Sequence, residues 1–303
     1  MPVTSESAPN KRTVLFRRIL SSIILVSAVL GILLAPNRSI SDPMVGILSV
    51  TLVGLGLREF FKLLESKQFP SFYFFGIGAG CLTTLMEFLQ SAGYLDLGRI
   101  RSMPVELLAV SFVLILLIVG VCAHRDIKLV VHALSSTLFG VVYVSILFNF
   151  LIRVFYHPDA NGPVLVIYAI AVTKCGDAGA YFVGNLIGKN ALIPTLSPGK
   201  TWEGALGGII TSVGISVLIF YFVQDIFGEL SIIWAILLGL LLGVGGIAGD
   251  LVESLFKRQS GLKDSGGIFP GIGGVLDLLD SLLFNAPILY FVVEIFLVKG
   301  ANG

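Results

Sequence analysis

The chain has 303 residues, of which 55% are hydrophobic and 13% are charged, and its formal net charge is +1. Because charged residues make up about a quarter of an average soluble domain, this composition indicates an integral membrane protein. A near-neutral chain whose basic residues are scattered between apolar runs lacks the basic face that nucleic-acid binding requires, so that class of protein is excluded.

Apolar runs recur along the whole chain. A membrane-spanning helix needs about 20 largely apolar residues, so these runs predict an all-α polytopic helical bundle with about nine transmembrane helices. The runs are 18–35, 44–57, 72–90, 105–123, 130–152, 163–187, 205–223, 231–249 and 281–298. The second is short and could extend to 64, and the sixth is interrupted by polar residues, so eight to ten spans fit the sequence.

The positions of the cations orient this bundle. Run 18–35 is too long for a signal peptide and is followed by no small-residue cleavage site, so we expect a retained helix. Loops rich in Lys and Arg stay in the cytoplasm. With residues 1–17 as a cytoplasmic tail, fourteen of the 20 Lys and Arg residues fall on that side. They are Lys11, Arg12, Arg17, Arg18, Arg58, Lys62, Lys67, Arg125, Lys128, Lys189, Lys200, Lys257, Arg258 and Lys263.

The two halves of the chain differ in polarity. Residues 18–155 are expected to form the N-terminal transmembrane helices, with Glu87 and Asn149 pointing into the bundle. Residues 156–303 carry polar, glycine-rich motifs at the predicted cytoplasmic ends of spans. Segment 250–280 alone holds eight of the 39 charged residues. Charge this dense between apolar spans is costly and indicates a functional site.

The first motif of the second half is TKCGDAGAYFVGNLIGK, residues 173–189. Lys174, Asp177 and Tyr181 have the i, i+3, i+7 spacing of one helix face inside a span. A lysine and an aspartate at this depth are expected to pair or to line a cavity.

The second motif is SPGKTWEG, residues 197–204. It predicts a turn followed by a helix start, with Thr201 as the N-cap and Glu203 in the first turn. Lys200 beside that helix N-terminus could bind an anion. Taken singly, this motif and the preceding one fit a structural role better than a functional one.

The third motif is segment 250–280. Asp250, Glu253, Ser254 and Lys257 share one helix face, although an amphipathic juxtamembrane helix with solvated charges would show the same spacing. Lys263 and Asp264 follow, then a glycine- and proline-broken loop, and then Asp277 and Asp280. Facing carboxylates favour Mg²⁺ completed by substrate phosphates, and neighbouring Lys and Arg can hold phosphate oxygens. The set suits phosphoryl or nucleotidyl transfer.

Together these motifs resemble the phosphatidate cytidylyltransferase, or CDP-diacylglycerol synthase, family. The positions that match its C-terminal signature are Ser254, Lys257, Arg258, Lys263, Asp264, Pro270, Gly273, Gly274, Asp277 and Asp280. The chain departs from the signature at two positions, because Ile272 stands where the signature has His and Leu278 where it has Arg. Neither side chain can bind phosphate or transfer a proton.

The resemblance implies a reaction between CTP and phosphatidate that gives CDP-diacylglycerol and pyrophosphate for phospholipid synthesis. It implies an integral membrane enzyme, expected in the cell inner (plasma) membrane and in contact with membrane lipids, with its active site facing the cytoplasm. The lipid phosphate attacks the α-phosphorus of CTP and needs no strong general base. A second cation beside Mg²⁺ and a homodimer are both compatible with the sequence.

The resemblance also implies roles for individual residues. The catalytic set is Asp250, Lys257, Asp264 and Asp277, and the metal ligands are Asp250 and Asp277 supported by Asp280. The phosphate-binding set is Lys200, Ser254, Arg258, Lys263, Gly273 and Gly274. The residues expected to line the cavity are Lys174, Asp177, Tyr181, Glu203 and Glu253.

Three alternatives to this function remain open from the sequence. A CTP-dependent kinase of a polyprenol or phytol would need similar motifs, with Asp177 or Glu253 as the base. A transporter would explain an intramembrane lysine and aspartate, and a non-catalytic paralogue would explain the departures at Ile272 and Leu278.

Overall fold

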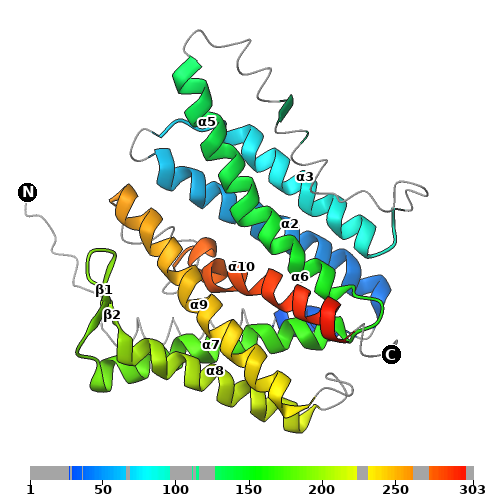
Figure 1. Cartoon of the computed structure of the whole chain (residues 1–303). Coiled ribbons are helices and arrows are strands. Elements are labelled where there is room, and N and C mark those ends of the chain that lie inside the picture. Colours follow the sequence, from blue (N-terminus) through cyan, green and yellow to red (C-terminus); the bar gives the residue numbers. More distant parts are fainter. Residues whose placement is uncertain are drawn as a thin grey trace, which may run out of the picture.

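The computed structural model describes residues 27, 29–35, 37–65, 69–95, 111, 114, 115, 127–223, 231–261 and 273–297. Within these ranges the chain is a helical bundle with one small hairpin (Figure 1). The prediction of an all-α bundle is therefore confirmed, apart from this hairpin.

The N-terminal half contributes three long helical segments. They are α2 (Arg38–Glu65), α3 (Tyr73–Ser91) and a segment made of α5 (Ile127–Gly140), a π-helical turn (Val141–Ile146) and α6 (Leu147–Phe155). Glu87 of α3 forms a bidentate ion pair with Arg153 of α6. The Arg153 Nη2 lies 2.8 Å from Glu87 Oε2, and the Arg153 Nε lies 3.0 Å from Glu87 Oε1. Both Glu87 and Asn149 are buried, so the expectation that they point into the bundle is confirmed.

The C-terminal half contains α7 (Gly162–Ile187), a hairpin of β1 (Ala191–Ile193) and β2 (Ser197–Thr201), α8 (Trp202–Phe222), α9 (Ile232–Ser260) and α10 (Val275–Val292). The hairpin pairs Ala191 with Thr201 and Ile193 with Ser197 in antiparallel register. The sequence predicted only a turn at 197–200, whereas the structure places these residues in a strand. Thr201 caps α8 as predicted, because its hydroxyl accepts the Gly204 N–H at 3.1 Å.

Six helical segments of the described chain are long and apolar enough to cross a membrane. They are Arg38–Glu65, Leu129–Phe155, Gly162–Ile187, Trp202–Phe222, Ile232–Ser260 and Val275–Ile295. Each corresponds to one predicted run. Run 72–90 forms α3, which is not among the six, and runs 18–35 and 105–123 lie largely outside the described residues. The total of about nine spans thus stays a prediction.

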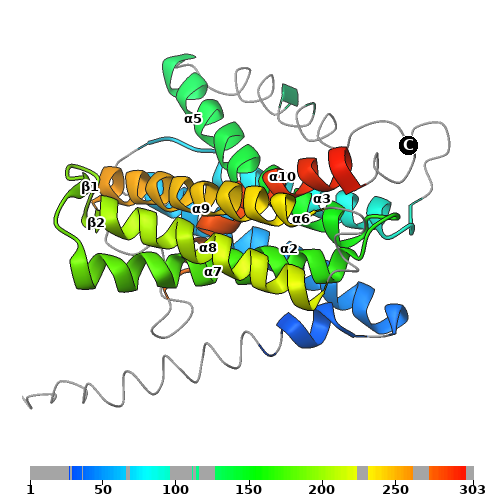
Figure 2. The same ribbon diagram turned by 60° about the horizontal axis from the view of Figure 1, so that its bottom comes forward.

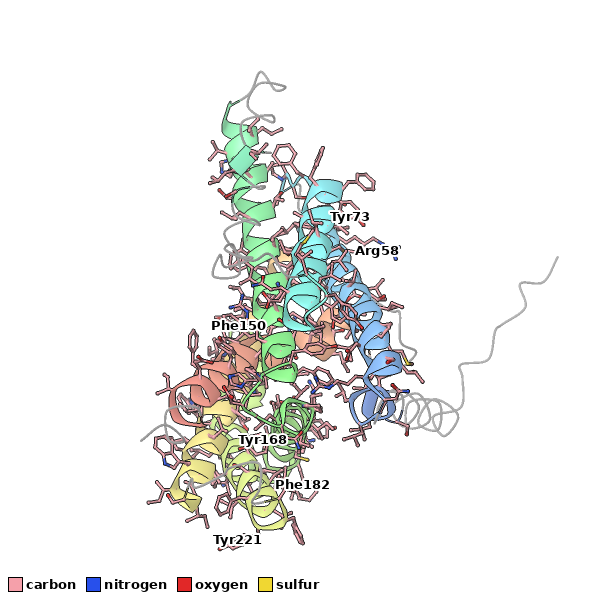
Figure 3. The ribbon with its side chains drawn as sticks, turned by 90° about the vertical axis from the view of Figure 1, so that its right-hand side faces the viewer. Arg58, Tyr73, Phe150, Tyr168, Phe182 and Tyr221 are labelled. Carbon is pink, nitrogen blue, oxygen red and sulfur yellow. The ribbon has the colours of Figure 1, made fainter. Side chains whose placement is uncertain are left out.

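Large apolar side chains cover much of the outer surface. Phe74 of α3 is 84% exposed, Phe222 of α8 80% and Ile210 of α8 71%. Figure 3 shows Phe182 and Tyr221 on the outside of α7 and α8. A soluble protein rarely leaves so extensive an apolar surface uncovered, so these faces fit contact with lipid acyl chains.

Helix α10 joins the two halves of the bundle (Figure 1). Its N-terminal part packs in a core cluster with α2, the π-helical turn and α6, including Phe60 and Tyr143. Its C-terminal part packs with α7 and α9, where Leu289 and Leu242 belong to one core cluster. Polar residues on α10 therefore face groups from both halves of the chain.

Two local contacts fix the position of α10. Gly249 of α9 lies so close to it that a Cβ at this position would collide with the carbonyl oxygen of Asp280. On α2, buried Glu59 accepts the backbone N–H of Leu276 at 2.8 Å, where helix N-terminal amides lack partners and favour a negative charge. These contacts bring the acidic face of α10 against α9.

Candidate functional site

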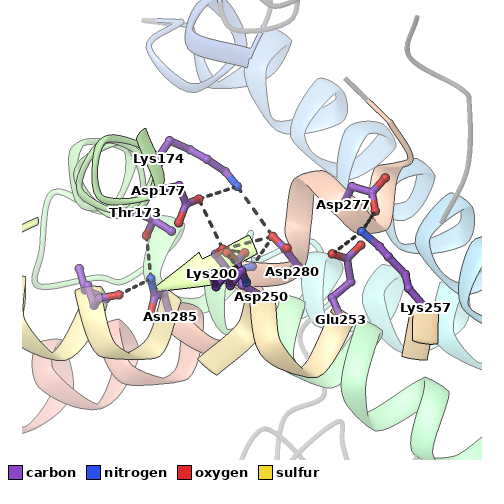
Figure 4. A network of polar contacts seen from close by, with 12 residues as sticks. Thr173, Lys174, Asp177, Lys200, Asp250, Glu253, Lys257, Asp277, Asp280 and Asn285 are labelled. Carbon is purple, nitrogen blue, oxygen red and sulfur yellow. Dashed lines mark hydrogen bonds and ion pairs between the residues drawn. The ribbon is translucent and has the colours of Figure 1, made fainter. Parts of the chain in front are cut away.

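A partly buried polar cluster lies where α7, β2, α9 and α10 meet (Figure 4). We call it the Asp250 cluster, and it consists of Lys174, Asp177, Lys200, Asp250, Asp280 and Ser281. Lys200 Nζ lies 2.9 Å from Asp250 Oδ2, and Ser281 donates to Asp250 Oδ1 at 2.8 Å. Lys174 Nζ lies 3.3 Å from Asp177 Oδ2 and 3.9 Å from Asp280 Oδ1. The expected pairing of Lys174 with Asp177 is confirmed.

The Asp250 cluster carries an excess of negative charge. Its three carboxylates and two ammonium groups leave one uncompensated negative charge, and Asp280 is only 5% exposed. The carboxylates of Asp250 and Asp280 lie beside each other, because the Ser281 hydroxyl contacts Asp250 Oδ1 at 2.8 Å and Asp280 Oδ1 at 3.2 Å. Two neighbouring carboxylates repel each other unless a proton or a cation lies between them. The arrangement therefore favours an additional positive charge.

A second group, the Glu253 cluster, lies one turn further along α9 (Figure 4). It consists of Glu253, Lys257 and Asp277, with Lys257 Nζ 2.8 Å from Glu253 Oε2 and 2.7 Å from Asp277 Oδ1. The expected common face of Glu253 and Lys257 on a helix is confirmed. Glu253 Oε1 is buried and has no hydrogen-bond partner among the described residues, so this cluster also has unused capacity for a donor or a cation.

Asp277 holds the start of α10 as well as Lys257. Its Oδ2 accepts the Gly274 N–H at 2.8 Å. The preceding Gly273 has a φ of 111°, and a Cβ there would collide with the Asp277 carboxylate. The two glycines of the signature thus allow the backbone to fold tightly around this aspartate.

A cavity of about 420 Å³ opens beside the Asp250 cluster. It lies between α7, β2, α8 and α9, and Asp177, Lys200 and Asp250 line it together with Thr201 and Tyr181. Its volume is in the range of sites for small molecules, roughly 300–1,000 Å³. Lys200 and the N-terminus of α8 offer positive charge to this cavity, and the carboxylates of Asp177 and Asp250 also line it. Such a cavity suits a phosphorylated ligand held with a cation.

The oxygen-rich clusters match the chemistry of Mg²⁺. Among the described residues, no group of three or more His, Cys, Asp and Glu side chains is arranged to hold a metal ion. Mg²⁺, however, usually takes one or two carboxylates and completes its shell with water and substrate phosphates. The adjacent carboxyl groups of Asp250 and Asp280 fit that mode of binding.

The structure distributes the residues predicted from the sequence over three places. Lys174, Asp177, Lys200, Asp250 and Asp280 meet in the Asp250 cluster, whereas Glu253, Lys257 and Asp277 meet in the Glu253 cluster. Tyr181 lines the cavity with a side chain that is 75% exposed. Lys263, Asp264 and Ile272 lie outside the described residues, and Ser254 is partly buried on α9.

Two predicted site residues contact the hairpin region instead. Arg258 Nε donates to the carbonyl oxygen of Leu196 in the β1–β2 turn at 2.9 Å. Glu203 accepts the backbone N–H groups of Lys189 at 3.1 Å and Asn190 at 3.3 Å. Both side chains therefore hold the segment that carries Lys200.

The sequence reasoning missed three polar residues of the site and its surroundings. Ser281 donates a hydrogen bond to Asp250, and Glu59 accepts one from the start of α10. Asn285 donates to the Thr173 hydroxyl of α7 at 2.7 Å and to the Leu242 carbonyl oxygen of α9 at 2.9 Å. Asp277, Ser281 and Asn285 follow one another at four-residue spacing on α10. That polar stripe inside an apolar run was the available signal.

Comparison with known proteins places these features in context. Residues 16–296 match the family model described as the cytidylyltransferase family. The chain is 32% identical over 280 residues to the phosphatidate cytidylyltransferase of Haemophilus influenzae, covering 89% of this chain and 96% of that protein. It is 34% identical over 249 residues to the phosphatidate cytidylyltransferase of Bacillus subtilis, covering 82% and 89%. It is also 32% identical over 250 residues to the uncharacterized protein YnbB of Escherichia coli, covering 79% and 76%.

Proposed function

This chain belongs to the cytidylyltransferase family, and from that premise we propose that it is an integral membrane enzyme that transfers a cytidylyl group from CTP to phosphatidate. The products are CDP-diacylglycerol and pyrophosphate. The observation that carries the proposal is the near full-length similarity to relatives named phosphatidate cytidylyltransferase. The Asp250 cluster beside a cavity of about 420 Å³ supplies groups suited to this chemistry.

The proposed reaction follows from the charges of the two clusters. A phosphate oxygen of phosphatidate forms a bond to the α-phosphorus of CTP, and the bond from that phosphorus to the pyrophosphate oxygen breaks. The attacking oxygen is already an anion, so the main barrier that the site must lower is repulsion between phosphates. Lys200 lies at the cavity wall and is positioned to bind the triphosphate.

We propose that Asp250 and Asp280 hold Mg²⁺. When bound, the ion supplies the positive charge that two adjacent carboxylates and a triphosphate require. Lys257, held by Glu253 and Asp277, adds a cation one turn away along α9. The earlier expectation of Asp277 as a direct ligand stays a prediction, since its described contacts are to Lys257 and Gly274.

The membrane placement is part of the proposal. The chain is expected in the bacterial inner membrane with the hairpin and the end of α9 facing the cytoplasm, where CTP is available. Both features lie at one end of the bundle (Figure 2), and the Arg258 contact to Leu196 joins them. Assembly into a homodimer stays a prediction.

The position of the transferred phosphorus tests this function. Membranes containing the protein are incubated with phosphatidate and CTP labelled at either the α- or the γ-phosphate. We expect label in the lipid product only from the α-position. Label entering lipid only from the γ-position would indicate a CTP-dependent lipid kinase, and label entering from neither would indicate a non-catalytic protein.

A further inference from the structure

A second cavity, of about 310 Å³, lies on the other side of α7 from the first. Side chains of α2, α6, α7 and α10, together with residues 29–33, form its wall, and nearly all of them are aliphatic or aromatic. Among the described residues of the lining, Lys174 is the one that carries a charge. An apolar cavity with a single cation is complementary to an amphipathic anion.

Lys174 stands between this apolar cavity and the Asp250 cluster. Its ammonium group contacts Asp177, which lines the first cavity, at 3.3 Å, and Asp280 at 3.9 Å. Both distances exceed those of a short charge-assisted hydrogen bond, roughly 2.7–2.9 Å. Its side chain is 35% exposed. The ammonium therefore has donor capacity for a further oxygen ligand.

Leu278 of α10 lines the same apolar cavity. It occupies the position where the signature described above has an arginine, so α10 places no cation in this cavity. Lys174 faces the same cavity from α7. The positive charge that the signature places on α10 is thus matched in this chain by the charge of Lys174 on α7.

We propose that Lys174 binds the phosphate of phosphatidate and supplies the positive charge that Leu278 lacks, while the apolar cavity holds part of an acyl chain. The inference rests on the proposed function, for which it identifies the lipid subsite. A phosphate held at Lys174 lies beside Asp177 and Asp280, next to the cavity assigned to CTP. This position suits attack on the α-phosphorus.

The first test is a kinetic comparison of purified full-length variants in detergent–phosphatidate mixed micelles. Lys174→Gln should raise KM for phosphatidate about tenfold or more, as expected for loss of a charged hydrogen bond, and should change KM for CTP less than twofold. Lys174→Arg should stay near wild type. Lys62→Gln, at an exposed lysine of α2, is the control and should change neither constant. An unchanged KM for phosphatidate, or equal increases for both substrates, would overturn the assignment.

The second test exchanges the two side chains. Lys174→Leu should lose activity, and the double variant Lys174→Leu/Leu278→Arg should recover it to within a few-fold of wild type, because the cation returns to the same cavity from α10. A double variant no more active than Lys174→Leu would contradict the relocation of the charge.

A binding measurement separates this inference from the proposed function, because it uses no CTP. Phosphatidate should raise the melting temperature of the wild-type protein, whereas uncharged diacylglycerol of the same chains should raise it less. In the Lys174→Gln variant, the two lipids should raise the melting temperature by the same amount. If the difference persisted in Lys174→Gln, the inference would fail even in an active enzyme. If it disappeared while the wild type formed no CDP-lipid, the lipid subsite would stand and the proposed function would fail.

Discussion

At the scale of single residues, two carboxylates of the site each form an ion pair with a lysine. Asp250 pairs with Lys200 at 2.9 Å and Asp277 pairs with Lys257 at 2.7 Å. Removing one member of such a pair leaves the other charge uncompensated, at a cost between the roughly 0–1 kcal/mol of an exposed pair and the roughly 3–5 kcal/mol of a fully buried one. The same lysines can exchange a carboxylate for a phosphate when substrate enters. The pairs therefore keep the cations in place before CTP binds.

The pair of Lys200 with Asp250 gives a prediction for CTP binding. Lys200→Gln should raise KM for CTP about tenfold or more, because a charged hydrogen bond is worth about 1.5–3 kcal/mol, and should leave KM for phosphatidate nearly unchanged. Lys200→Arg should retain part of the affinity. Steady-state kinetics with each substrate varied in turn provides the measurement. A Lys200→Gln variant with wild-type KM for CTP would contradict the role assigned to this lysine.

At the scale of the helices, the close packing of α10 against α9 determines where the carboxylates of the site lie. Gly249 permits that approach, because a Cβ there would meet the carbonyl oxygen of Asp280. A side chain would displace the Asp280 backbone and with it the carboxylate that contacts Asp250. Helix–helix contacts in membranes commonly use small residues in this way.

Substitution of Gly249 tests this packing. Gly249→Ala should lower both the melting temperature and the rate of CDP-diacylglycerol formation, because the added methyl forces α9 and α10 apart. Gly214→Ala on α8 is the matched control, since a Cβ there has no neighbour within 4 Å. It should be neutral or stabilising by about 0.5–1 kcal/mol, as alanine is favoured over glycine inside a helix. Equal behaviour of the two variants would contradict the role of Gly249.

Contacts within a single helix could be predicted from the sequence, whereas contacts between distant segments could not. Helical spacing correctly placed Lys174 beside Asp177 and Glu253 beside Lys257, because these contacts lie within one or two turns of a single helix. The pairing of Lys200 with Asp250 and of Glu59 with the start of α10 could not be predicted, since each joins distant segments. The hairpin was missed because strand 197–201 is short and contains Pro198 and Gly199, which are typical of turns.

At the scale of the whole molecule, α10 places one site between two cavities of different character. The first cavity is lined by Lys200 and carboxylates, and the second is apolar with Lys174 at its polar end. A soluble nucleotide and a membrane lipid can thus approach the Asp250 cluster from different sides. The sequence indicated the polar residues but not this separation, which depends on how the two halves pack around α10.

The predicted orientation can be checked in intact cells. In a variant with Cys81, Cys122 and Cys175 replaced by serine, single cysteines are introduced as Asp159→Cys or Pro198→Cys, at exposed positions near opposite ends of α7. A membrane-impermeant thiol reagent that passes the outer membrane should label the first variant and leave the second unlabelled until the inner membrane is opened. The reverse pattern would place the site on the outer side.

The most direct measurement of the central claim compares CDP-diacylglycerol formation by the purified wild-type chain and by Asp250→Asn and Asp280→Asn, with CTP, phosphatidate and Mg²⁺. We predict magnesium-dependent turnover by the wild type, with one pyrophosphate released per CDP-lipid. Each variant should lose at least about a hundredfold of that activity, the usual effect of removing one group that stabilises charge in the transition state, while remaining monodisperse in detergent. Wild-type turnover in either monodisperse variant would contradict the assignment of the Asp250 cluster as the catalytic centre.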